Sequence, residues 1–551
     1  MSIPVAYATS ASPSVVVGQE ALTIADVVAV ARNGATVTLD PSALESVAAS
    51  RRIVEDLAQD VEPHYGISTG FGALATTFIA EERRAQLQAS LVRSHAAGSG
   101  AEVEREVVRA LMLLRLSTVM TARTGARAVT AETYAAILNA GITPVVREYG
   151  SLGCSGDLAP LAHCALVAMG EGEVRVGETH PGEAEARSAP LEAAATSTAR
   201  ATGHDAGTLM SAGEALAAAG IVPLRLAEKE GLALINGTDG MLGMLALALD
   251  DLGRLMTTAD ISAAMSVEGL LGTDAVFAED LHRLRPQAGQ ALSAANLRAL
   301  LSGSPIVASH SGPECTRVQD AYSLRCAPQV HGAARDTIAH ATIVAERELA
   351  SAVDNPVLTL DGRVESNGNF HGAPIAYVLD FLAIAAADVA SMSERRTDRF
   401  LDRARNQGLP PFLAHEVGVD SGLMIAQYTA AGIVSELKRL AVPASVDSIP
   451  SSAMQEDHVS MGWAAARKLR RSIDGLGRVL AIEIMTAARG LELRAPLVPG
   501  VATGAVVALV RTVADGPGQD RFLSPEIEGV VGSVQSGAIA AAAASVIGGL
   551  R

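Results

Sequence analysis

The chain has 551 residues, of which 49% are hydrophobic and only 3% aromatic, and its net charge is −17. This length can bury a large core, and the composition favours closely packed helices over sheets, which are richer in aromatic and β-branched residues. The excess of acidic side chains makes a phosphate backbone an unfavourable partner, so we expect no nucleic-acid binding.

The cysteines and the apolar segments exclude several further classes of protein. None of the four cysteines has a partner at CxxC spacing, so we expect neither a metal site nor a disulfide framework. Residues 1–20 have no basic residue before their apolar part, which argues against a secretory signal. The most apolar stretch, residues 373–392, contains Asp380 and Asp388 and predicts a buried helix, not a membrane span. We therefore expect a cytoplasmic protein without a membrane contact.

The first part of the chain predicts a short helix, a strand over Thr36–Leu39 and a second helix from about Ser42. The glycines of Tyr65–Gly72 (YGISTGFG) then indicate a tight loop with positive φ angles. This loop lacks the lysine of a phosphate-binding loop, and alone it is unspecific. The next predicted helix contains Ser94-His95, although a histidine on a helix is more often a surface or core residue than a ligand-binding one.

The segment Gly150–Leu161 (GSLGCSGDLAPL) contains the groups needed for a backbone cyclisation. Gly156 has no Cβ, so its amide nitrogen can approach the carbonyl carbon of Cys154, and Ser155 carries a hydroxyl that can leave as water. Ring closure and two dehydrations would give an imidazolone with an exocyclic methylidene, an electrophile that no unmodified side chain provides. Taken alone, such a Gly/Ser cluster more often indicates only a turn.

From Gly170 to Ala212 the chain is rich in Gly, Glu, Ala, Ser and Thr and has no apolar periodicity. This composition is typical of a long surface loop, and we expect the insertion 172–208 to be dispensable. The following segment, Glu228–Thr238 (EKEGLALINGT), contains Asn236 before a glycine, a pair that often marks a turn.

Helices are expected over residues 241–300, and Val318–Gly332 (VQDAYSLRCAPQVHG) follows them. Gln319, Tyr322 and Arg325 are spaced to share one helix face over a turn and a half. The planar fork of an arginine suits a carboxylate, although a polar helix face is the simpler interpretation.

Three long helices are predicted over residues 373–401, 420–441 and 459–489, and each is apolar on more than one face. This indicates burial against other helices, including helices of other subunits. Two loops flank the first and the last of them: Asn367–Gly372 (NGNFHG), which contains Phe370, and Pro450–Met461 (PSSAMQEDHVSM), which contains Glu456. The acidic residues of the second loop are typical of a helix N-terminus, where the dipole favours them.

Six of these segments resemble, in order, the signature segments of the histidine and aromatic amino acid ammonia-lyases. The resemblance covers nearly the whole chain outside the first 20 residues and the insertion. It implies a mainly α fold with a long central helix bundle and a smaller, loop-rich N-terminal region that carries the active-site loops. The expected division is residues 1–212, 213–490 and 491–551. The family is homotetrameric, with active sites shared between subunits.

The resemblance also implies a cofactor and roles for individual residues. The cofactor is 4-methylideneimidazole-5-one (MIO), formed from Cys154, Ser155 and Gly156. Tyr65 corresponds to the catalytic base, and Arg325 to the residue that pairs with the carboxylate of the amino acid substrate. The other residues that correspond to family positions in the site are Asn236, Tyr322, His95, Gln319, Phe370 and Glu456. This chain departs from the commoner family residues at Cys154 (alanine), Asp239 (glutamine), Asn367 (glycine) and Met454 (asparagine).

The pair Ser94-His95 resembles the selectivity position of histidine-specific members, which implies conversion of L-histidine to trans-urocanate and ammonia. Other readings remain open. Within the family, a tyrosine or phenylalanine ammonia-lyase or an aminomutase is the alternative. A second alternative is the helical fumarase and argininosuccinate-lyase class, whose signature loop is similar to Ser451–Met454. In that class a proline and then a lysine-containing segment follow, whereas Gln455 and Glu456 follow here. A helical assembly protein without catalytic activity is the third possibility.

Overall fold

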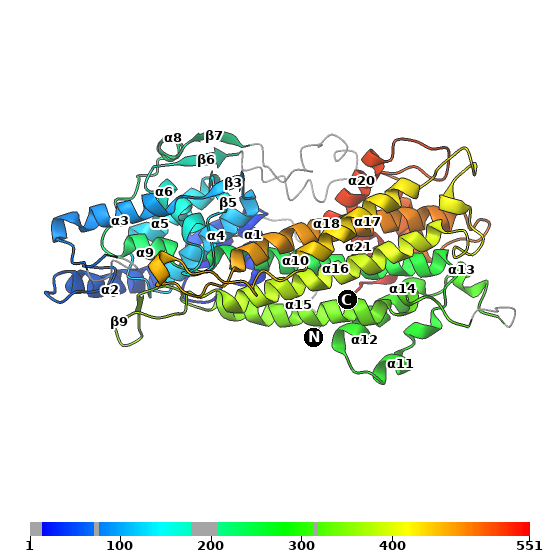
Figure 1. Cartoon of the computed structure of the whole chain (residues 1–551), viewed down its shortest axis with the longest axis horizontal. Helices are drawn as coiled ribbons and strands as arrows, with labels where there is room; N and C mark the ends of the chain where they lie inside the picture. Colours follow the sequence, from blue (N-terminus) through cyan, green and yellow to red (C-terminus); the bar gives the residue numbers. More distant parts are fainter. Residues whose placement is uncertain (1–13, 71–76, 178–206, 313–317) are drawn as a thin grey trace. The chain divides into compact units, whose positions relative to one another are not determined.

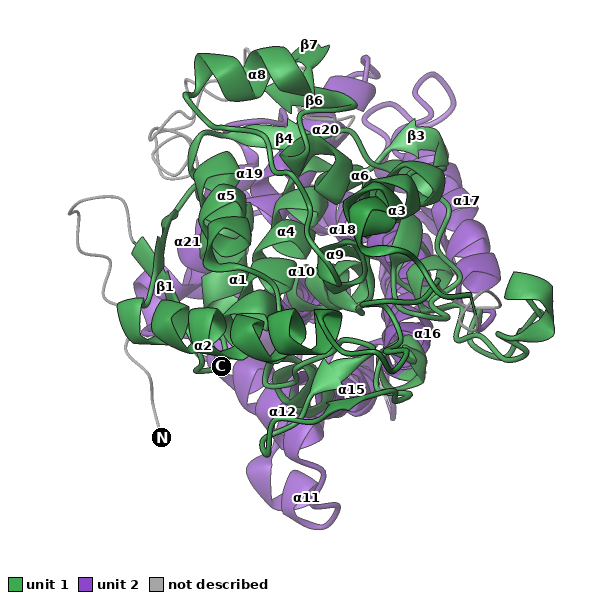
Figure 2. Cartoon of the chain, turned by 90° about the vertical axis from the view of Figure 1, so that its left-hand side faces the viewer, with its two compact units in different colours: residues 1–247, 343–377, 444–467 green, residues 248–342, 378–443, 468–551 purple. Residues whose placement is uncertain are grey.

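Helices dominate the computed structural model, which describes residues 14–70, 77–177, 207–312 and 318–551, and strands are few and short (Figure 1). The expected mainly α fold class is therefore confirmed. The chain divides into two units, shown in Figure 2: unit 1 comprises residues 1–247, 343–377 and 444–467, and unit 2 comprises residues 248–342, 378–443 and 468–551. The three regions expected from the sequence are consecutive stretches of the chain, whereas each unit combines three separate segments. The expected regions therefore stay a prediction.

Unit 1 begins with a parallel pair of strands that a helix connects. β1 (Ser14–Val17) pairs with β2 (Thr36–Leu39), and α1 (Ile24–Ala31) lies between them in the sequence. A side-chain cap from Asp40 to the amide of Ala43 and a proline in the first turn start α2 (Pro41–Ala58). The predicted order of helix, strand and helix is thus confirmed. The remaining helices of unit 1 are α3 (Glu81–His95), α4 (Arg105–Met120), α5 (Ala128–Asn139), α6 (Leu158–Ala168), α8 (Ala212–Ala218) and α9 (Glu230–Ile235), and η6 (Ser452–Met454) is a 3₁₀ turn.

The expectation of a structureless loop from Gly170 to Ala212 is wrong at its two ends. β6 (Glu173–Val176) pairs antiparallel with β4 (Ile142–Pro144) on one side and β7 (Thr208–Ser211) on the other, and Val174 is fully buried. A deletion of 172–208 would remove the middle strand of this sheet, so it is not expected to be neutral. Residues 178–206 lie outside the described residues. The other strands are β3 (Ser99–Glu102) with β5 (Arg147–Tyr149), and β8 (Val357–Leu358) with β9 (Val364–Glu365).

Helix α4 forms the centre of unit 1, since all of its residues from Val107 to Met120 are buried. Two of them, Arg109 and Arg115, are charged. Arg109 donates to the carbonyl oxygens of Val30 and Leu138, so its guanidinium links α4 to the ends of α1 and α5. A buried arginine is tolerated because its donors are satisfied by backbone acceptors.

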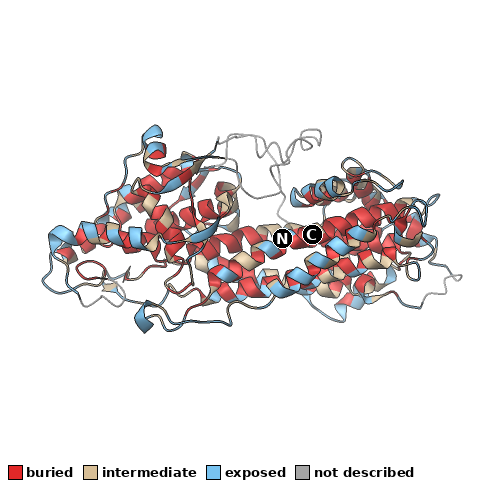
Figure 3. Ribbon diagram, turned by 45° about the horizontal axis from the view of Figure 1, so that its top comes forward, coloured by how far each residue is buried: buried red, intermediate tan, exposed pale blue. Residues whose placement is uncertain are grey.

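Unit 2 contains most of the long helices, which carry exposed as well as buried residues along their length (Figure 3). The predicted helices over 373–401, 420–441 and 459–489 are confirmed as α16 (Ala373–Leu401), α17 (Met424–Leu440) and α18 (Gly462–Glu492). Two further long helices, α10 (Asp239–Gly269) and α15 (Ala327–Leu349), pass from one unit into the other. The shorter elements are η4 (Ala275–Phe277), α11 (Glu279–Arg283), α12 (Ala288–Leu301), α13 (Pro305–Ala308), α14 (Tyr322–Arg325), η5 (Pro411–Leu413), α19 (Val501–Val510), α20 (Ser524–Gln535) and α21 (Ala538–Ile547).

Buried polar contacts tie the helices of unit 2 together. Arg396 of α16 makes a two-pronged ion pair with Glu483 of α18, at 2.5 and 2.8 Å, and both side chains are fully buried. Ser266 of α10 donates to the same carboxylate at 2.6 Å. A third bond of Arg396 goes to the carbonyl oxygen of Ser323, so this network also holds the short helix α14.

Helix α16 is long and apolar enough to cross a bilayer by length and composition alone, and α20 with α21 would be so only as a bent pair. In α16, however, 61% of the 18-residue apolar stretch that could span a bilayer is buried inside the protein. Asp380, within that stretch, is itself buried and pairs with Lys468 at 2.5 Å. A core helix has these properties, as the sequence predicts.

Candidate active site

The Cys154-Ser155-Gly156 triplet lies in the loop between β5 and α6, and the segment after α9 packs directly on it. Gly156 has a φ of +75°, a conformation that favours glycine. A Cβ at this position would lie 1.9 Å from the carbonyl oxygen of Gly237. The same oxygen accepts a hydrogen bond of 2.7 Å from the amide of Asp157. Any larger residue at position 156 is therefore excluded by backbone, not by a movable side chain.

These features fit the formation of MIO. The nitrogen that must attack belongs to a residue without a Cβ, held in a bend by the neighbouring backbone. Ser155, the source of the methylidene, is half-buried, so that it remains reachable, whereas Cys154 is buried. Among the described residues, no three His, Cys, Asp or Glu side chains gather as metal ligands.

The other side of the triplet loop is held by the segment that precedes α18. Ser460 Oγ donates to the carbonyl oxygen of Gly153 at 2.8 Å, and the amide of Met461 donates to that of Leu152 at 2.9 Å. The amide of Gly372, at the end of the NGNFHG loop, reaches Gly153 O at 3.5 Å. Two segments far apart in the sequence thus meet at this loop.

Asp157 is a residue whose role the sequence reasoning missed. Its carboxylate accepts from Ser151 Oγ and from the amide of Met241, each at 2.8 Å, in the first turn of α10. Burial raises the pKa of Asp157 to about 7, against the opposing effect of these hydrogen bonds. The carboxyl group thereby links both ends of the triplet loop to α10. The sequence places Asp157 directly after the triplet, which could have drawn attention to it. It does not indicate that the amide of Met241, 84 positions away, binds its carboxylate.

Glu456 faces the triplet. Ser155 Oγ makes a long hydrogen bond of 3.4 Å to Glu456 Oε1, and Ser451 Oγ donates to Oε2 at 2.7 Å. The expected helix N-terminus at Glu456 is wrong: the residue lies in a loop closed by an antiparallel bridge to Ser451, and α18 begins only at Gly462. Burial and the nearby Glu456 carboxylate raise the pKa of the Cys154 thiol to about 12, so the thiol stays protonated.

His95 ends α3, and its tautomer follows from its contacts. Nδ1 lies 2.9 Å from the carbonyl oxygen of Leu91, which can only accept, so Nδ1 carries the proton. Nε2 is then the acceptor nitrogen of the neutral ring. Burial lowers the pKa of His95 from its ordinary value of 6.5, while the Leu91 hydrogen bond and the charge of Glu456 oppose this shift. The negative charge of Glu456 thus acts on the His95 ring.

Asn236 and Tyr65 are held by a common framework. Asn236 is buried, its Nδ2 donates to the carbonyl oxygen of Asn355 at 2.9 Å, and its Oδ1 has no hydrogen-bond partner among the described residues. Tyr65 is half-buried and precedes Gly66, whose φ is +74°. Gln88 of α3 accepts from the amide of Gly231 at the start of α9 and donates to the carbonyl oxygen of Gly66. This one side chain links the Tyr65 loop to the helix that ends at Asn236. Residues 71–76, which include the end of the predicted glycine loop, lie outside the described residues.

Phe370 is half-buried in the loop that leads to Gly372. The next residue, His371, stacks on His458 with ring centroids 5.3 Å apart, and His371 Nε2 lies 3.2 Å from His458 Nδ1. The amide of Ala373 donates to His371 Nδ1, so His371 Nε2 is the donor of that contact. The two loops that carry Phe370 and Glu456 are therefore joined by a histidine pair that the sequence did not predict.

Gln319, Tyr322 and Arg325 belong to unit 2, whereas the other eight predicted site residues belong to unit 1. The single helix face expected for them is wrong, because α14 begins only at Tyr322 and Gln319 precedes it. They nevertheless meet: Arg325 Nη2 donates to Gln319 Oε1 at 2.8 Å, and the Arg325 guanidinium lies over the Tyr322 ring at 4.7 Å. Arg325 Nε is buried and has no hydrogen-bond partner among the described residues.

Comparison with known proteins shows the family to which the chain belongs. A family model described as aromatic amino acid lyase matches residues 22–512. A histidine ammonia-lyase from Streptomyces avermitilis is 61% identical over 98% of this chain and 99% of its own length. Among solved structures, histidine ammonia-lyase from Trypanosoma cruzi is 35% identical with a TM-score of 0.84 and covers 96% of this chain and 95% of its own. Tyrosine aminomutase from Streptomyces globisporus is also 35% identical, with a TM-score of 0.87, and covers 98% of this chain and 100% of its own.

Proposed function

The chain belongs to the aromatic amino acid lyase family, and from this premise we propose that it eliminates ammonia from L-histidine, without oxidation, to give trans-urocanate. The observation that carries the proposal is the contact of Glu456 with Ser155 of the triplet, together with the effect of the Glu456 charge on His95. The two side chains offer a carboxylate and a neutral imidazole acceptor to a polar substrate ring. The 61% identity to a histidine ammonia-lyase over nearly the full length supports the same substrate.

The chemical difficulty of the reaction lies in the weakly acidic β-hydrogen and in the poor leaving ability of the amino group. MIO, formed from Cys154, Ser155 and Gly156, supplies an electrophile that makes the substrate nitrogen a better leaving group. Tyr65 removes the β-proton as general base.

The remaining residues bind and orient the substrate. Arg325 binds the carboxylate, which the planar fork of a guanidinium suits. His95 accepts an N–H of the substrate imidazole at Nε2, and Glu456 accepts from the other side of the ring or from the amine. Asn236, with its unpaired Oδ1, contacts the amine or the MIO ring, while Phe370, Gln319 and Tyr322 line the site.

Incubation of the purified protein with L-histidine, followed by the absorbance of urocanate, tests the proposal directly. L-Tyrosine and L-phenylalanine serve as competing substrates under the same conditions. We expect urocanate from histidine and no β-amino acid from any of the three. A β-amino acid product would instead identify an aminomutase, a possibility that the structural likeness to a tyrosine aminomutase makes worth testing. Absence of all turnover would favour a non-catalytic protein.

Replacement of His95 by phenylalanine should shift substrate choice towards an apolar ring. The variant removes the acceptor for the imidazole N–H, and an unpaired buried polar group costs about 1–3 kcal/mol, or roughly 5- to 150-fold in kcat/KM. Phenylalanine should become a detectable substrate because the electrophile and the base are unchanged. Glu456 still disfavours an apolar ring and limits the gain. The measurement is the ratio of kcat/KM for the two substrates, and an unchanged ratio would remove His95 from the specificity pocket.

The acid side of the pH profile should also depend on His95. Only the neutral ring has an acceptor at Nε2, and the pKa of His95 lies below 6.5 because the ring is buried. The His95 contribution to kcat/KM is therefore retained as the pH falls to 6.5 and lost below it. Folding stability follows the same direction, because below pH 6.5 the unfolded chain binds a proton that the native ring does not. His95→Gln keeps an acceptor without a titration, so an acid limb identical in this variant and the wild type would contradict the assignment.

We also infer a homotetramer in the cytoplasm. On α16, Tyr377, Phe381 and Ile384 are exposed at helical spacing, and Ile425 and Tyr428 are exposed on α17. Apolar faces of this kind are typical of helices that pack against other subunits. Light scattering coupled to size-exclusion chromatography measures the mass in solution. A monomer at micromolar concentration would contradict the assembly.

A further inference from the structure

A buried arginine of α4, Arg115, lies behind the segment that packs on the triplet. Its side chain is fully buried. Nη1 donates to the carbonyl oxygens of Ala233 and Asn236, each at 3.0 Å, and Nη2 donates to that of Val353 at 3.1 Å. Arg115 therefore holds the end of α9 at the point where the chain turns towards Gly237.

Gly237 fills the space between Arg115 and the triplet. A Cβ at Gly237 would lie 2.1 Å from Arg115 Nη2 and 2.4 Å from Asp239 Oδ2. On the opposite side, the carbonyl oxygen of Gly237 is the atom that a Cβ at Gly156 would meet at 1.9 Å. A side chain at Gly237 would therefore meet Arg115, and one at Gly156 would meet Gly237. The guanidinium, the Gly237 peptide and Gly156 are thus successive neighbours, and the Arg115 side chain backs the peptide that packs on Gly156.

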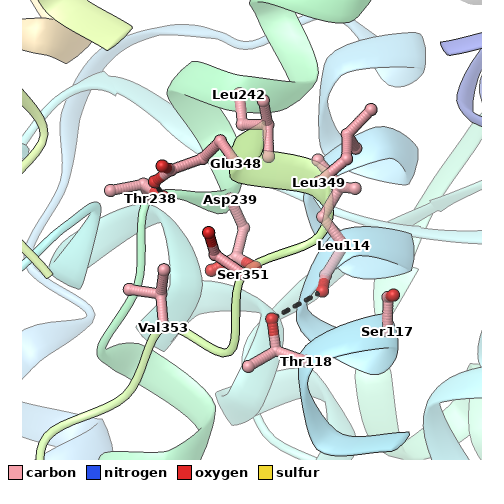
Figure 4. Close-up of a pocket in the computed structure, with 10 residues that line it drawn as sticks. All are labelled: Leu114, Ser117, Thr118, Thr238, Asp239, Leu242, Glu348, Leu349, Ser351 and Val353. Atoms are coloured by element: carbon pink, nitrogen blue, oxygen red, sulfur yellow. Dashed lines mark hydrogen bonds between the residues drawn. The ribbon is translucent and has the colours of Figure 1, made fainter. Parts of the chain in front are cut away.

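Asp239 completes the support. Its Oδ2 forms an ion pair at 2.8 Å with Arg115 Nη2, the nitrogen that also donates to the carbonyl oxygen of Val353. Figure 4 shows Asp239 in a small polar pocket with Thr238, Glu348 and Ser351. Thr238 Oγ1 donates to Glu348 Oε1 at 2.6 Å.

A buried ion pair is weak evidence for stability, since the cost of removing two charges from water offsets most of their attraction. Here the ion pair has a specific location, because Arg115 and Asp239 both lie next to Gly237, the residue that packs on Gly156. None of the contacts of Arg115 involves the groups to which we assign the substrate, apart from the backbone of Asn236. Its position points to the formation of the cofactor, not to turnover.

We propose that Arg115, paired with Asp239, is a positioning residue for the cyclisation of Cys154-Ser155-Gly156. The inference rests on the proposed function, because it requires that MIO forms. By holding Gly237 against Gly156, the pair restricts the triplet to the bent conformation in which the Gly156 nitrogen meets the Cys154 carbonyl carbon. Pre-orientation of this kind accelerates ring closure, and a misplacement of about 1 Å can cost about 10²-fold.

The reaction needs no oxidant or further reactant. The Gly156 nitrogen forms a bond to the Cys154 carbonyl carbon, and its proton moves to the carbonyl oxygen. That hydroxyl leaves as water with the proton of the Ser155 amide, which gives a C=N bond. The Ser155 hydroxyl leaves as a second water with the proton on Cα, which gives the methylidene.

The test follows this loss of water in time. Wild type, Arg115→Lys, Arg115→Met and Asp239→Asn are made by cell-free synthesis, and intact mass is recorded after synthesis is stopped. Arg109→Met is the matched control, because Arg109 is a second buried arginine of α4 whose carbonyl partners lie in other elements. Circular dichroism measures the folded fraction and Tm of each variant.

We expect the wild type and Arg109→Met to lose two waters at similar rates. The Arg115 and Asp239 variants should lose them at least about tenfold more slowly at an equal folded fraction. Folded Arg115 variants that mature at the wild-type rate would overturn the inference while leaving the proposed function intact, as would equal slowing in Arg109→Met. If Arg115→Met does not fold, the milder Arg115→Lys and Asp239→Asn decide by the same criterion. A folded wild type without mass loss would overturn the proposed function, and this inference with it.

Discussion

Replacement of Ser155 by alanine is expected to abolish both the loss of two waters and the turnover of histidine. The Ser155 hydroxyl is the only leaving group within the triplet from which the exocyclic methylidene can form. Without it, no electrophile is available to take up the substrate amine, and we expect kcat to fall to the background of the assay. The fold should be retained, because the hydrogen bond of Ser155 to Glu456 is long and half-exposed. Intact mass, kcat and Tm are the three measurements.

Cys154→Ala is the matched control for this experiment. Cys154 contributes only its carbonyl carbon and side chain to the ring, and alanine is the commoner family residue at this position. The thiol, with its pKa raised to about 12 by burial, is also unsuited to act as a nucleophile. Cys154→Ala should therefore keep the mass loss and most of the activity. Activity in Ser155→Ala equal to that of Cys154→Ala would rule out the cofactor.

Tyr65→Phe should reduce kcat by about 10²–10⁴-fold, the usual contribution of a general base. The variant removes one oxygen atom from a loop whose backbone is fixed independently. Ile67, two residues on, is buried against Val54, Ala58 and Leu358, and Gln88 binds the carbonyl oxygen of Gly66. Loop geometry and the mass loss at the triplet should consequently be unchanged. This combination separates a missing base from a missing cofactor.

Tyr134→Phe provides the comparison, because it is the same chemical change at a fully buried position of unit 1. The Tyr134 hydroxyl has no hydrogen-bond partner among the described residues, so its removal should leave kcat unchanged and Tm equal or higher. Turnover by Tyr65→Phe at the rate of Tyr134→Phe would mean that another group is the base.

The long helices could be predicted almost to their ends because apolar periodicity is a local property of the sequence. The strand pairing of β6 could not, because its alternation of polar residues and valines is only four residues long, and its partners lie in β4 and β7. The loop position of Glu456 was missed for a similar reason: acidic residues before a helix are typical of its first turn, whereas here a bridge to Ser451 sets the backbone.

The residues of the candidate active site could be predicted only where they belong to a recognisable sequence motif. Gln319 and Arg325 were expected to meet through helical spacing, but they meet through a side-chain hydrogen bond that crosses the start of α14. Arg115 was not predicted at all. Its sequence signal is a charged residue inside a helix that is buried on every side, and its partners at Asn236 and Val353 are 121 and 238 positions away.

The hydrogen bonds to the carbonyl oxygen of Gly153 have a consequence for the order of events while the chain is synthesised. Ser460, which holds this carbonyl, is 307 positions further along the chain, and Gly237 is itself translated well after Gly156. Contacts of such high sequence separation form late in folding. Under the proposed function, the nascent chain therefore emerges with an ordinary, unreactive peptide at the triplet, and cyclisation waits until its later parts have joined it. A cyclised triplet would then be a permanent chemical record that a given molecule has folded, and partly folded chains would carry no reactive electrophile.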